Sequence, residues 1–324
     1  MKYKKKLRIQ PENWRPLADE IPLSTPYLIF IDPSSKCNLQ CKFCPNKIIK
    51  DKSVMSFSLY KKIIAQIKEF PEKIDTLRLY GFGEPLLCPS FTDMVKYARD
   101  LDVSNKIDTT TNATLLNPYF NLELAECGID RINISVNGMS AKQYKNFSNY
   151  KIDFDKFVGN IGNLYSLVKG KTEIIIKLNG DYCSAEDCEN FISLFSLISD
   201  GINIEHSMNC WPEFKVDNVN KKVGIYGQKP NEVKVCSYIF YQMTVHSDGK
   251  VSLCFLDYNN ILSMGDVRKT KIKDIWESAM WNYWKFENLF GHREMLPVCK
   301  DCQQLKYGMP VNLDPYAEKI LKRL

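Results

Sequence analysis

The chain contains 324 residues, of which 44% are hydrophobic and 25% are charged; this composition is typical of folded globular proteins and excludes a disordered chain. Its net charge is +6, but most of that charge belongs to a lysine-rich stretch at the start, so a broad nucleic-acid-binding surface is not expected. No apolar run reaches the ~18 residues of a membrane span, and the first residues lack the apolar core of a signal peptide, so we expect a cytoplasmic protein.

Short β-rich runs alternate with longer amphipathic segments through the first two-thirds of the sequence. The predicted strands are 27–32, 76–81, 105–110, 131–136, 172–178 and 202–208, and the predicted helices between them are 58–70, 89–101, 117–127, 153–169 and 184–199. Such alternation predicts parallel strands joined by right-handed crossovers. Six units predict an α/β fold with an open, partial (β/α)6 barrel, two units short of a full eightfold barrel.

The sequence after the sixth strand changes character. Residues 211–235 are polar and interrupted by glycine and proline, and they predict a linker between a barrel domain at 27–210 and a small domain at 236–324. Residues 1–26 form a basic extension. In the small domain we predict a β-hairpin over 241–255, which turns at Ser247-Asp248-Gly249, then a tryptophan-rich helix over 271–288 and a short helix from Pro315.

The chain has 12 cysteines, and because disulfides are rare in the cytoplasm, this number indicates metal or redox chemistry. Cys37, Cys41 and Cys44 form a C-x3-C-x2-C run directly after the first strand. Three thiolates on a four-iron cluster leave one iron open to a ligand. Thiolates also suit zinc, but a structural zinc loop needs a fourth ligand, and none follows Cys44 closely. The position at the carboxyl end of a barrel strand favours an active site.

This cysteine loop, with the aromatic Phe43 before its last cysteine, resembles the radical S-adenosylmethionine (radical SAM) superfamily. The resemblance implies that the three cysteines hold a [4Fe–4S] cluster whose fourth iron is chelated by SAM. It also implies that one electron from this cluster cleaves SAM to a 5′-deoxyadenosyl radical, which abstracts hydrogen from the substrate. An external electron donor of the flavodoxin or ferredoxin type is a further implication.

Other strand ends carry segments similar to the SAM-contacting motifs of that family. Gly81-Phe82-Gly83-Glu84 is similar to the glycine–glutamate motif, although Phe82 separates the two glycines, and Ser135-Val136-Asn137-Gly138 is similar to a Ser-x-Asp-Gly segment with Asn137 in place of the acid. Glycines allow close approach of the backbone to a ligand, and a carboxylate accepts hydrogen bonds from an ammonium group. The resemblance implies SAM contacts at Gly81, Gly83, Glu84, Thr111, Asn112, Ser135, Asn137 and Lys177.

A second cysteine set lies beyond the linker. Cys236, Cys254, Cys299 and Cys302 have the pattern C-x17-C-x44-C-x2-C, and four thiolates can close the coordination of one centre, which the pattern allows to be zinc or a four-iron cluster. The segment resembles the twitch domain, the shortened form of the SPASM domain, in which a hairpin and a helix surround an iron–sulfur cluster. Since no cysteine follows Cys302, the resemblance implies a single auxiliary [4Fe–4S] cluster.

The remaining cysteines and the histidines show no compact ligand pattern. Four cysteines are expected to be core residues: Cys88, Cys127, Cys183 and Cys188. Cys210 follows the sixth strand and is the one candidate catalytic residue at the mouth of the active site. No histidine pairs with a carboxylate in the sequence pattern, so we assign none of them an acid–base role.

Two clusters in one chain indicate electron flow. Abstraction of hydrogen from a carbon that bears a hydroxyl leaves a radical that becomes a carbonyl once it loses an electron and a proton, and a closed auxiliary cluster can accept the electron. We therefore expect an oxidoreductase that oxidises a secondary alcohol of a sugar or cyclitol, like the twitch-domain dehydrogenases of amino-cyclitols. The alternatives are a peptide-modifying maturase, a radical epimerase in which Cys210 or Cys183 returns a hydrogen atom, and a zinc-stabilised binding module.

Overall fold

The structure is a computed structural model that describes residues 5, 16–217 and 219–324. Most of the basic extension predicted at 1–26 therefore lies outside the described residues. One open sheet of nine strands organises the molecule, in the order β6-β5-β4-β3-β2-β1-β7-β8-β9. The first six strands are parallel: β1 (Leu28–Ile31), β2 (Ile74–Arg78), β3 (Ser104–Thr111), β4 (Arg131–Val136), β5 (Glu173–Asn179) and β6 (Gly201–Glu205). The prediction of an open, six-unit α/β barrel is confirmed.

The C-terminal hairpin extends this sheet. Strand β7 (Gln242–Val245) pairs in parallel with β1, and β8 (Lys250–Ser252) and β9 (Ser263–Asp266) continue the sheet in antiparallel fashion. The hairpin was predicted, but β9 and the pairing with β1 were not. Cys254 of the second set therefore follows a strand of the same sheet that leads into the first cysteine loop.

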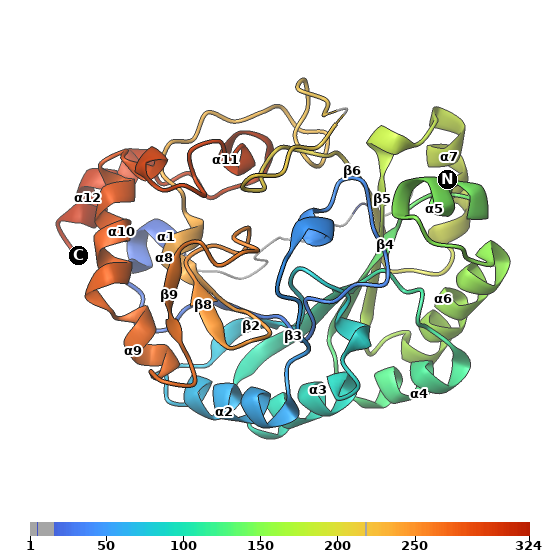
Figure 1. Cartoon of the computed structure of the whole chain (residues 1–324), viewed down its shortest axis with the longest axis horizontal. Coiled ribbons are helices and arrows are strands. Elements are labelled where there is room, and N and C mark those ends of the chain that lie inside the picture. Colours follow the sequence, from blue (N-terminus) through green and yellow to red (C-terminus); the bar gives the residue numbers. More distant parts are fainter. Residues whose placement is uncertain (1–4, 6–15, 218) are drawn as a thin grey trace.

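Helices cover the convex side of the sheet, as Figure 1 shows for α2, α3, α4 and α6, whereas α9, α10 and α12 lie beyond β9. The helices are α1 (Leu17–Glu20), α2 (Phe57–Ile67), α3 (Phe91–Asp100), α4 (Pro118–Glu126), α5 (Ala141–Ser148), α6 (Phe154–Val168), α7 (Ala185–Phe195), α8 (Tyr238–Tyr241), α9 (Ile272–Trp276), α10 (Ala279–Leu289), α11 (Gln304–Tyr307) and α12 (Ala317–Leu321). Single 3₁₀ turns occur at Pro45–Ile48, Pro85–Leu87, Gly180–Tyr182, Arg293–Met295 and Asp314–Tyr316.

Local sequence explains where these helices begin and which face they bury. In α2, the side chain of Ser56 caps the first turn by accepting a hydrogen bond from the Leu59 amide. The apolar residues Tyr60, Ile63, Ile64 and Ile67 recur at helical intervals and are buried against the sheet. The single tryptophan-rich helix predicted over 271–288 is wrong: it is divided into α9 and α10, because Ser278 caps a new helix by accepting from the Trp281 amide.

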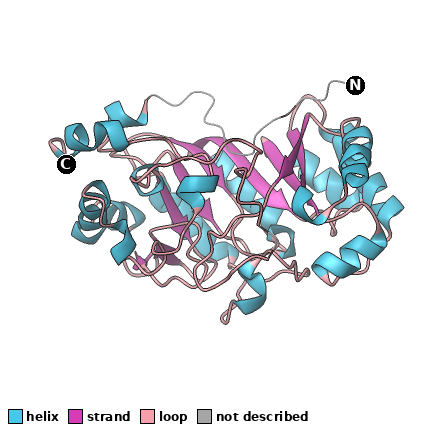
Figure 2. Cartoon of the chain, turned by 90° about the horizontal axis from the view of Figure 1, so that it is seen from above, coloured by secondary structure: helices cyan, strands magenta, loops and turns pink. Residues whose placement is uncertain are grey.

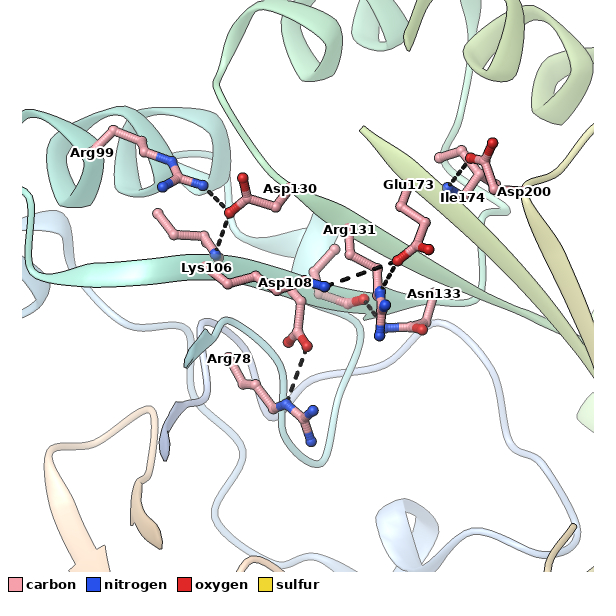
Figure 3. A network of polar contacts seen from close by, with 12 residues as sticks. Arg78, Arg99, Lys106, Asp108, Asp130, Arg131, Asn133, Glu173, Ile174 and Asp200 are labelled. Atoms are coloured by element: carbon pink, nitrogen blue, oxygen red, sulfur yellow. Dashed lines mark hydrogen bonds and ion pairs between the residues drawn. The ribbon is translucent and has the colours of Figure 1, made fainter. Parts of the chain in front are cut away.

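The face of the sheet opposite the helices carries charged residues (Figure 3). Arg78 on β2 donates to Asp108 on β3 over 3.1 Å, and both side chains are almost fully buried. Arg131 on β4 donates to Glu173 on β5. Arg78 and Asp108 lie two residues before Tyr80 and Thr110, and since side chains alternate along a strand, these pairs share one face. A buried ion pair adds little to stability, but here it makes the interior of the partial barrel polar.

None of the helices in the described part of the chain combines the length and the hydrophobicity that crossing a bilayer requires.

His246 follows β7 and is buried in the hairpin turn. Its Nε2 lies 2.9 Å from the Ser252 hydroxyl, and its ring stacks on that of Phe82 with centroids 5.5 Å apart. Burial disfavours the charged imidazolium and lowers the pKa of His246 from 6.5 to about 4.

This burial predicts a loss of stability on the acid side. The unfolded chain binds a proton at His246 below pH 6.5 and the folded chain does not, so stability falls as the pH drops from 6.5 towards 4. Between pH 7.5 and pH 5.5 the group removes about 1.4 kcal/mol from the free energy of unfolding. Urea unfolding at these two pH values is expected to show a shallower pH dependence for His246→Asn than for the wild type. Equal dependences in His246→Asn and the wild type would contradict the assignment.

Candidate active site

A cavity of about 320 Å³ lies at the carboxyl ends of the parallel strands, which is the edge where α/β barrels place their sites. Its volume is in the range of small-molecule sites. The lining includes Cys37 and Cys44 from the first cysteine loop, and Tyr238, Phe255 and Gln304 from the C-terminal region. Figure 2 shows the long loops that cross over the middle of the sheet. Both cysteine regions therefore contribute to the wall of one cavity.

The first cysteine loop is held by the end of α5. The amides of Gln40 and Lys42 donate to the carbonyls of Ser148 and Phe147 over 2.8 and 2.9 Å. Phe43 packs on the ring of Tyr182, with centroids 5.5 Å apart. Helix α5 was missed by sequence reasoning, although it fixes the path of the loop.

Two asparagines that are predicted to contact SAM reach the cysteine sulfurs in this structure. Asn137 Nδ2 lies 3.5 Å from Cys41 Sγ, and Asn112 Nδ2 lies 3.9 Å from Cys37 Sγ. Donors to cysteine sulfur tune and orient the ligands of iron–sulfur clusters. In this geometry the side-chain amides of Asn112 and Asn137 donate to the sulfurs of Cys37 and Cys41.

The three cysteines of the first set are half-buried and lie close to one another. Burial raises the pKa of Cys37 to about 11 and raises the pKa of Cys41 and Cys44, and the neighbouring thiols add to the shift at Cys37 and Cys41. A cationic iron centre stabilises such thiolates, so this donor set fits an iron–sulfur cluster. Within the described residues, no three His, Cys, Asp or Glu side chains meet the geometry of a single-ion site. The thiols of Cys37, Cys41 and Cys44 lie near one another but are not arranged around one metal ion.

The glycine–glutamate segment packs directly on the chain that leads into the cysteine loop. A Cβ on Gly83 would overlap the carbonyl oxygens of Ser34 and Lys36, and it would lie 2.6 Å from the carbonyl carbon of Ser35. The Glu84 amide also donates to Lys36 over 2.8 Å. Only glycine permits this approach.

The structure divides the predicted SAM contacts into two groups. Gly81, Gly83, Ser135, Asn137 and Lys177 line the cavity. Glu84, Thr111 and Asn112 are not among the lining residues; they form a hydrogen-bonded unit of their own.

The Glu84 carboxylate joins the ends of two strands. It accepts from the Thr111 hydroxyl over 2.6 Å, from the Asn112 amide over 2.7 Å and from the Leu86 amide over 3.1 Å. Burial nevertheless raises the pKa of Glu84 to about 7. The predicted contact between this carboxylate and the SAM amino group stays a prediction.

The four cysteines of the second set are half-buried as well. Burial and neighbouring thiols raise the pKa of Cys236 to about 12 and that of Cys254 far above its ordinary range. The Cys299 and Cys302 thiols are shifted upward by burial too, and Arg293 moderates the pKa of both. Four mutually close thiols, with a guanidinium nearby, fit a closed iron–sulfur cluster.

Cys210 lies between the cavity and the second cysteine set. It is buried, lines the cavity and packs with Met208, Leu256 and Tyr307 in a cluster that also touches Cys254 and Cys302. Cys210 therefore lies in the wall between the cavity and the second cysteine set. Its catalytic role stays a prediction. Cys88 and Cys127 are core residues, as expected, whereas Cys183 and Cys188 are half-buried.

A histidine–carboxylate pair at the cavity was missed. His206 Nδ1 lies 2.7 Å from Asp181 Oδ1, and His206 lines the cavity. The expectation that no histidine has such a partner is wrong for His206, and also for the exposed His292, which lies 2.7 Å from Glu287. The sequence shows only that Asp181 and His206 each follow a predicted strand. The pair could be recognised only from the structure, because there β5 and β6 are neighbouring strands.

Comparison with known sequence families identifies the class of protein. The sequence model of the radical SAM superfamily matches residues 31–187, and that of an iron–sulfur cluster-binding domain, SPASM, matches residues 236–303. The chain belongs to the radical SAM superfamily and carries a C-terminal SPASM-type domain. These domains imply a SAM-binding [4Fe–4S] cluster and an auxiliary iron–sulfur site.

Particular relatives share most of the chain at low identity. The tungsten-containing aldehyde ferredoxin oxidoreductase cofactor-modifying protein of Pyrococcus furiosus is 24% identical over 85% of this chain and 86% of its own length. The S-adenosyl-L-methionine-dependent 2-deoxy-scyllo-inosamine dehydrogenase of Niallia circulans is 21% identical over 86% of this chain and 93% of its own.

Solved structures show the same fold. BtrN in complex with AdoMet and 2-DOIA has a TM-score of 0.59 at 20% identity, covering 89% of this chain and 97% of that one. Streptococcus suis SuiB bound to S-adenosylmethionine has a TM-score of 0.65 at 18% identity, covering 92% and 76%.

Proposed function

We propose that this chain is a radical SAM oxidoreductase that oxidises a secondary alcohol of a sugar or cyclitol, with one auxiliary [4Fe–4S] cluster as the electron acceptor. One observation carries the proposal: a single cavity touches the first cysteine loop on one side and the region of the second cysteine set on the other. A substrate in that cavity lies next to both a radical source and an electron acceptor.

The proposal assigns ligands to both clusters. Cys37, Cys41 and Cys44 hold the cluster that binds SAM, and Cys236, Cys254, Cys299 and Cys302 hold the auxiliary cluster. When bound, the first cluster supplies the electron that cleaves SAM and thereby the radical that takes hydrogen from the alcohol carbon. The residues that contact SAM are Gly81, Gly83, Glu84, Thr111, Asn112, Ser135, Asn137 and Lys177. Asn112 and Asn137 also donate to the sulfurs of Cys37 and Cys41.

Polar side chains on one wall of the cavity suit a small polyol. Lys177 pairs with Glu205 over 3.2 Å, and Asn179 donates to Ser207 over 2.8 Å; all four line the cavity. The hydroxyl and amino groups of such a substrate can form hydrogen bonds with these side chains. The similarity to a 2-deoxy-scyllo-inosamine dehydrogenase over almost its whole length supports the same substrate class.

A second candidate function is radical epimerisation, favoured by the thiol of Cys210 in the cavity wall, from which a hydrogen atom could return to the substrate.

A third candidate function is peptide modification, because the chain shares its fold with SuiB bound to its precursor peptide, with a TM-score of 0.64. Membership in the superfamily leaves no reason to retain the zinc-stabilised binding module.

The remaining assignments are part of the same proposal. The barrel domain extends over 27–210, the linker over 211–235 and the auxiliary-cluster domain over 236–324. A flavodoxin or ferredoxin-type protein in a reducing cytoplasm supplies the electrons, since both clusters require reducing conditions.

The test uses sugars and cyclitols that carry deuterium on the alcohol carbon, with the anaerobically reconstituted protein. We expect the wild type to transfer deuterium to 5′-deoxyadenosine and to form one ketone for each transfer. Cys299→Ala is expected to keep the transfer and to lose at least ~100-fold in ketone, because the electron acceptor is lost; Cys188→Ala, outside both sets, is the control. Full ketone formation in Cys299→Ala would contradict the electron-acceptor role. Inverted alcohol, or transfer only from labelled peptides, would favour the two alternatives.

A further inference from the structure

His206 and Asp181 form a hydrogen-bonded pair at the cavity that has no role in the proposed function. We infer that His206, held by Asp181, takes the hydroxyl proton when the alcohol becomes a carbonyl. This inference rests on the proposed oxidation of an alcohol. The observation behind it is geometric: His206 lines the cavity, and its Nδ1 is held 2.7 Å from Asp181 Oδ1, which leaves Nε2 as the nitrogen that can serve a substrate.

The chain builds this pair with a tight turn. Gly180 begins the 3₁₀ turn after β5, and a Cβ at that position would lie 2.6 Å from Ile204 Cγ2 on β6. Glycine therefore brings the turn close enough to β6 for Asp181 to reach His206. The other oxygen of Asp181 accepts from the Ser207 amide over 2.6 Å, so both oxygens of this nearly buried carboxylate are oriented.

The backbone also holds the histidine. The His206 amide donates to the Ile225 carbonyl over 2.8 Å, and the ring is about three-quarters buried. An imidazole that is fixed through one nitrogen by a carboxylate presents the other as a proton acceptor, and the carboxylate stabilises the imidazolium that results. The arrangement is that of a general base.

The proposed oxidation needs such a base for its balance. The alcohol loses a hydrogen atom from carbon to the radical that SAM supplies, one electron to the auxiliary [4Fe–4S] cluster and one proton from oxygen; two electrons and two protons leave, and a carbonyl forms. The other carboxylate at the cavity, Glu205, is already paired with the Lys177 ammonium over 3.2 Å, which weakens it as a base. His206 is therefore the better acceptor, and general bases contribute about 10²–10⁴-fold to rates.

The experiment compares His206→Gln and Asp181→Asn with His292→Gln, a matched variant of the exposed pair with Glu287. It follows ketone formation, deuterium transfer from a labelled alcohol, and binding of SAM and of the alcohol by calorimetry. For His206→Gln we expect deuterium transfer within about 3-fold of the wild type, unchanged binding, and ketone formation lowered about 100-fold. For Asp181→Asn, a positioning residue, we expect kcat to fall about 10-fold with KM nearly unchanged. His292→Gln is expected to match the wild type.

The outcomes separate this inference from the proposed function. Wild-type ketone formation in His206→Gln would overturn the inference while the oxidation itself stands. A loss of SAM binding or of deuterium transfer in step with the ketone would also overturn it, because His206 would then hold the cofactor or the fold. A wild-type protein that takes no deuterium from any alcohol would overturn the proposed function, and the inference with it.

Discussion

Replacing Cys41 with alanine is expected to reduce SAM cleavage to the level of a control without enzyme. With two of three thiolates left, the cluster cannot be held in the geometry that leaves one iron open for SAM. Burial and the neighbouring thiols of Cys44 and Cys37 raise the pKa of Cys41 well above its ordinary range, and its sulfur accepts a hydrogen bond from Asn137.

The measurement is 5′-deoxyadenosine formation together with the iron content of the anaerobically reconstituted protein. Iron is expected to fall by half, because the auxiliary set is separate in sequence and on the other side of the cavity. Cys127→Ala removes a buried core thiol and is expected to retain both clusters and SAM cleavage. SAM cleavage at the wild-type rate in Cys41→Ala would refute the ligand assignment.

Replacing Gly83 with alanine is expected to lower the free energy of unfolding by more than about 3 kcal/mol and to impair SAM cleavage as well. The new Cβ would meet the carbonyls of Ser34 and Lys36, which are backbone atoms that cannot turn aside as a side chain could. The segment before Cys37 would have to move, and the hydrogen bond from the Glu84 amide to Lys36 would be broken. Overpacking against a fixed backbone belongs to the few mechanisms with effects of this size.

Gly159 provides the matched control. It is exposed within α6, and a Cβ there has no atom within 4 Å. Gly159→Ala is expected to stabilise the protein by about 0.5–1 kcal/mol, since alanine favours a helix interior. Denaturant unfolding of both variants is the measurement, with SAM cleavage as the second readout. A Gly83→Ala protein as stable as the wild type would show that the backbone at Gly83 and the backbone at Ser34 and Lys36 can move apart with little loss of stability.

Much of the fold could be predicted because its signals are local. The strand predicted at 131–136 coincides with β4 (Arg131–Val136), and the regular alternation of strands and helices predicts parallel crossovers. Strand ends were less certain: the sixth strand ends at Glu205 and not at 208, because the following residues leave the sheet to line the cavity. The alternation of strands and helices in the sequence cannot show at which residue a strand ends and the cavity wall begins.

The sequence by itself determined the first cysteine set, since the spacing of Cys37, Cys41 and Cys44 within one short loop is a local property of the chain. The second set, spread over residues 236–302, was predicted from its resemblance to a known domain. The tertiary structure alone decided the contacts across strands: the pairing of β7 with β1, the turn of Glu84 towards Thr111 and Asn112, and the meeting of Asp181 with His206. These partners are separated by 25 or more residues, and only the strand order brings them together. Parallel crossovers place distant strand ends side by side, so a site built there is encoded in topology and not in spacing.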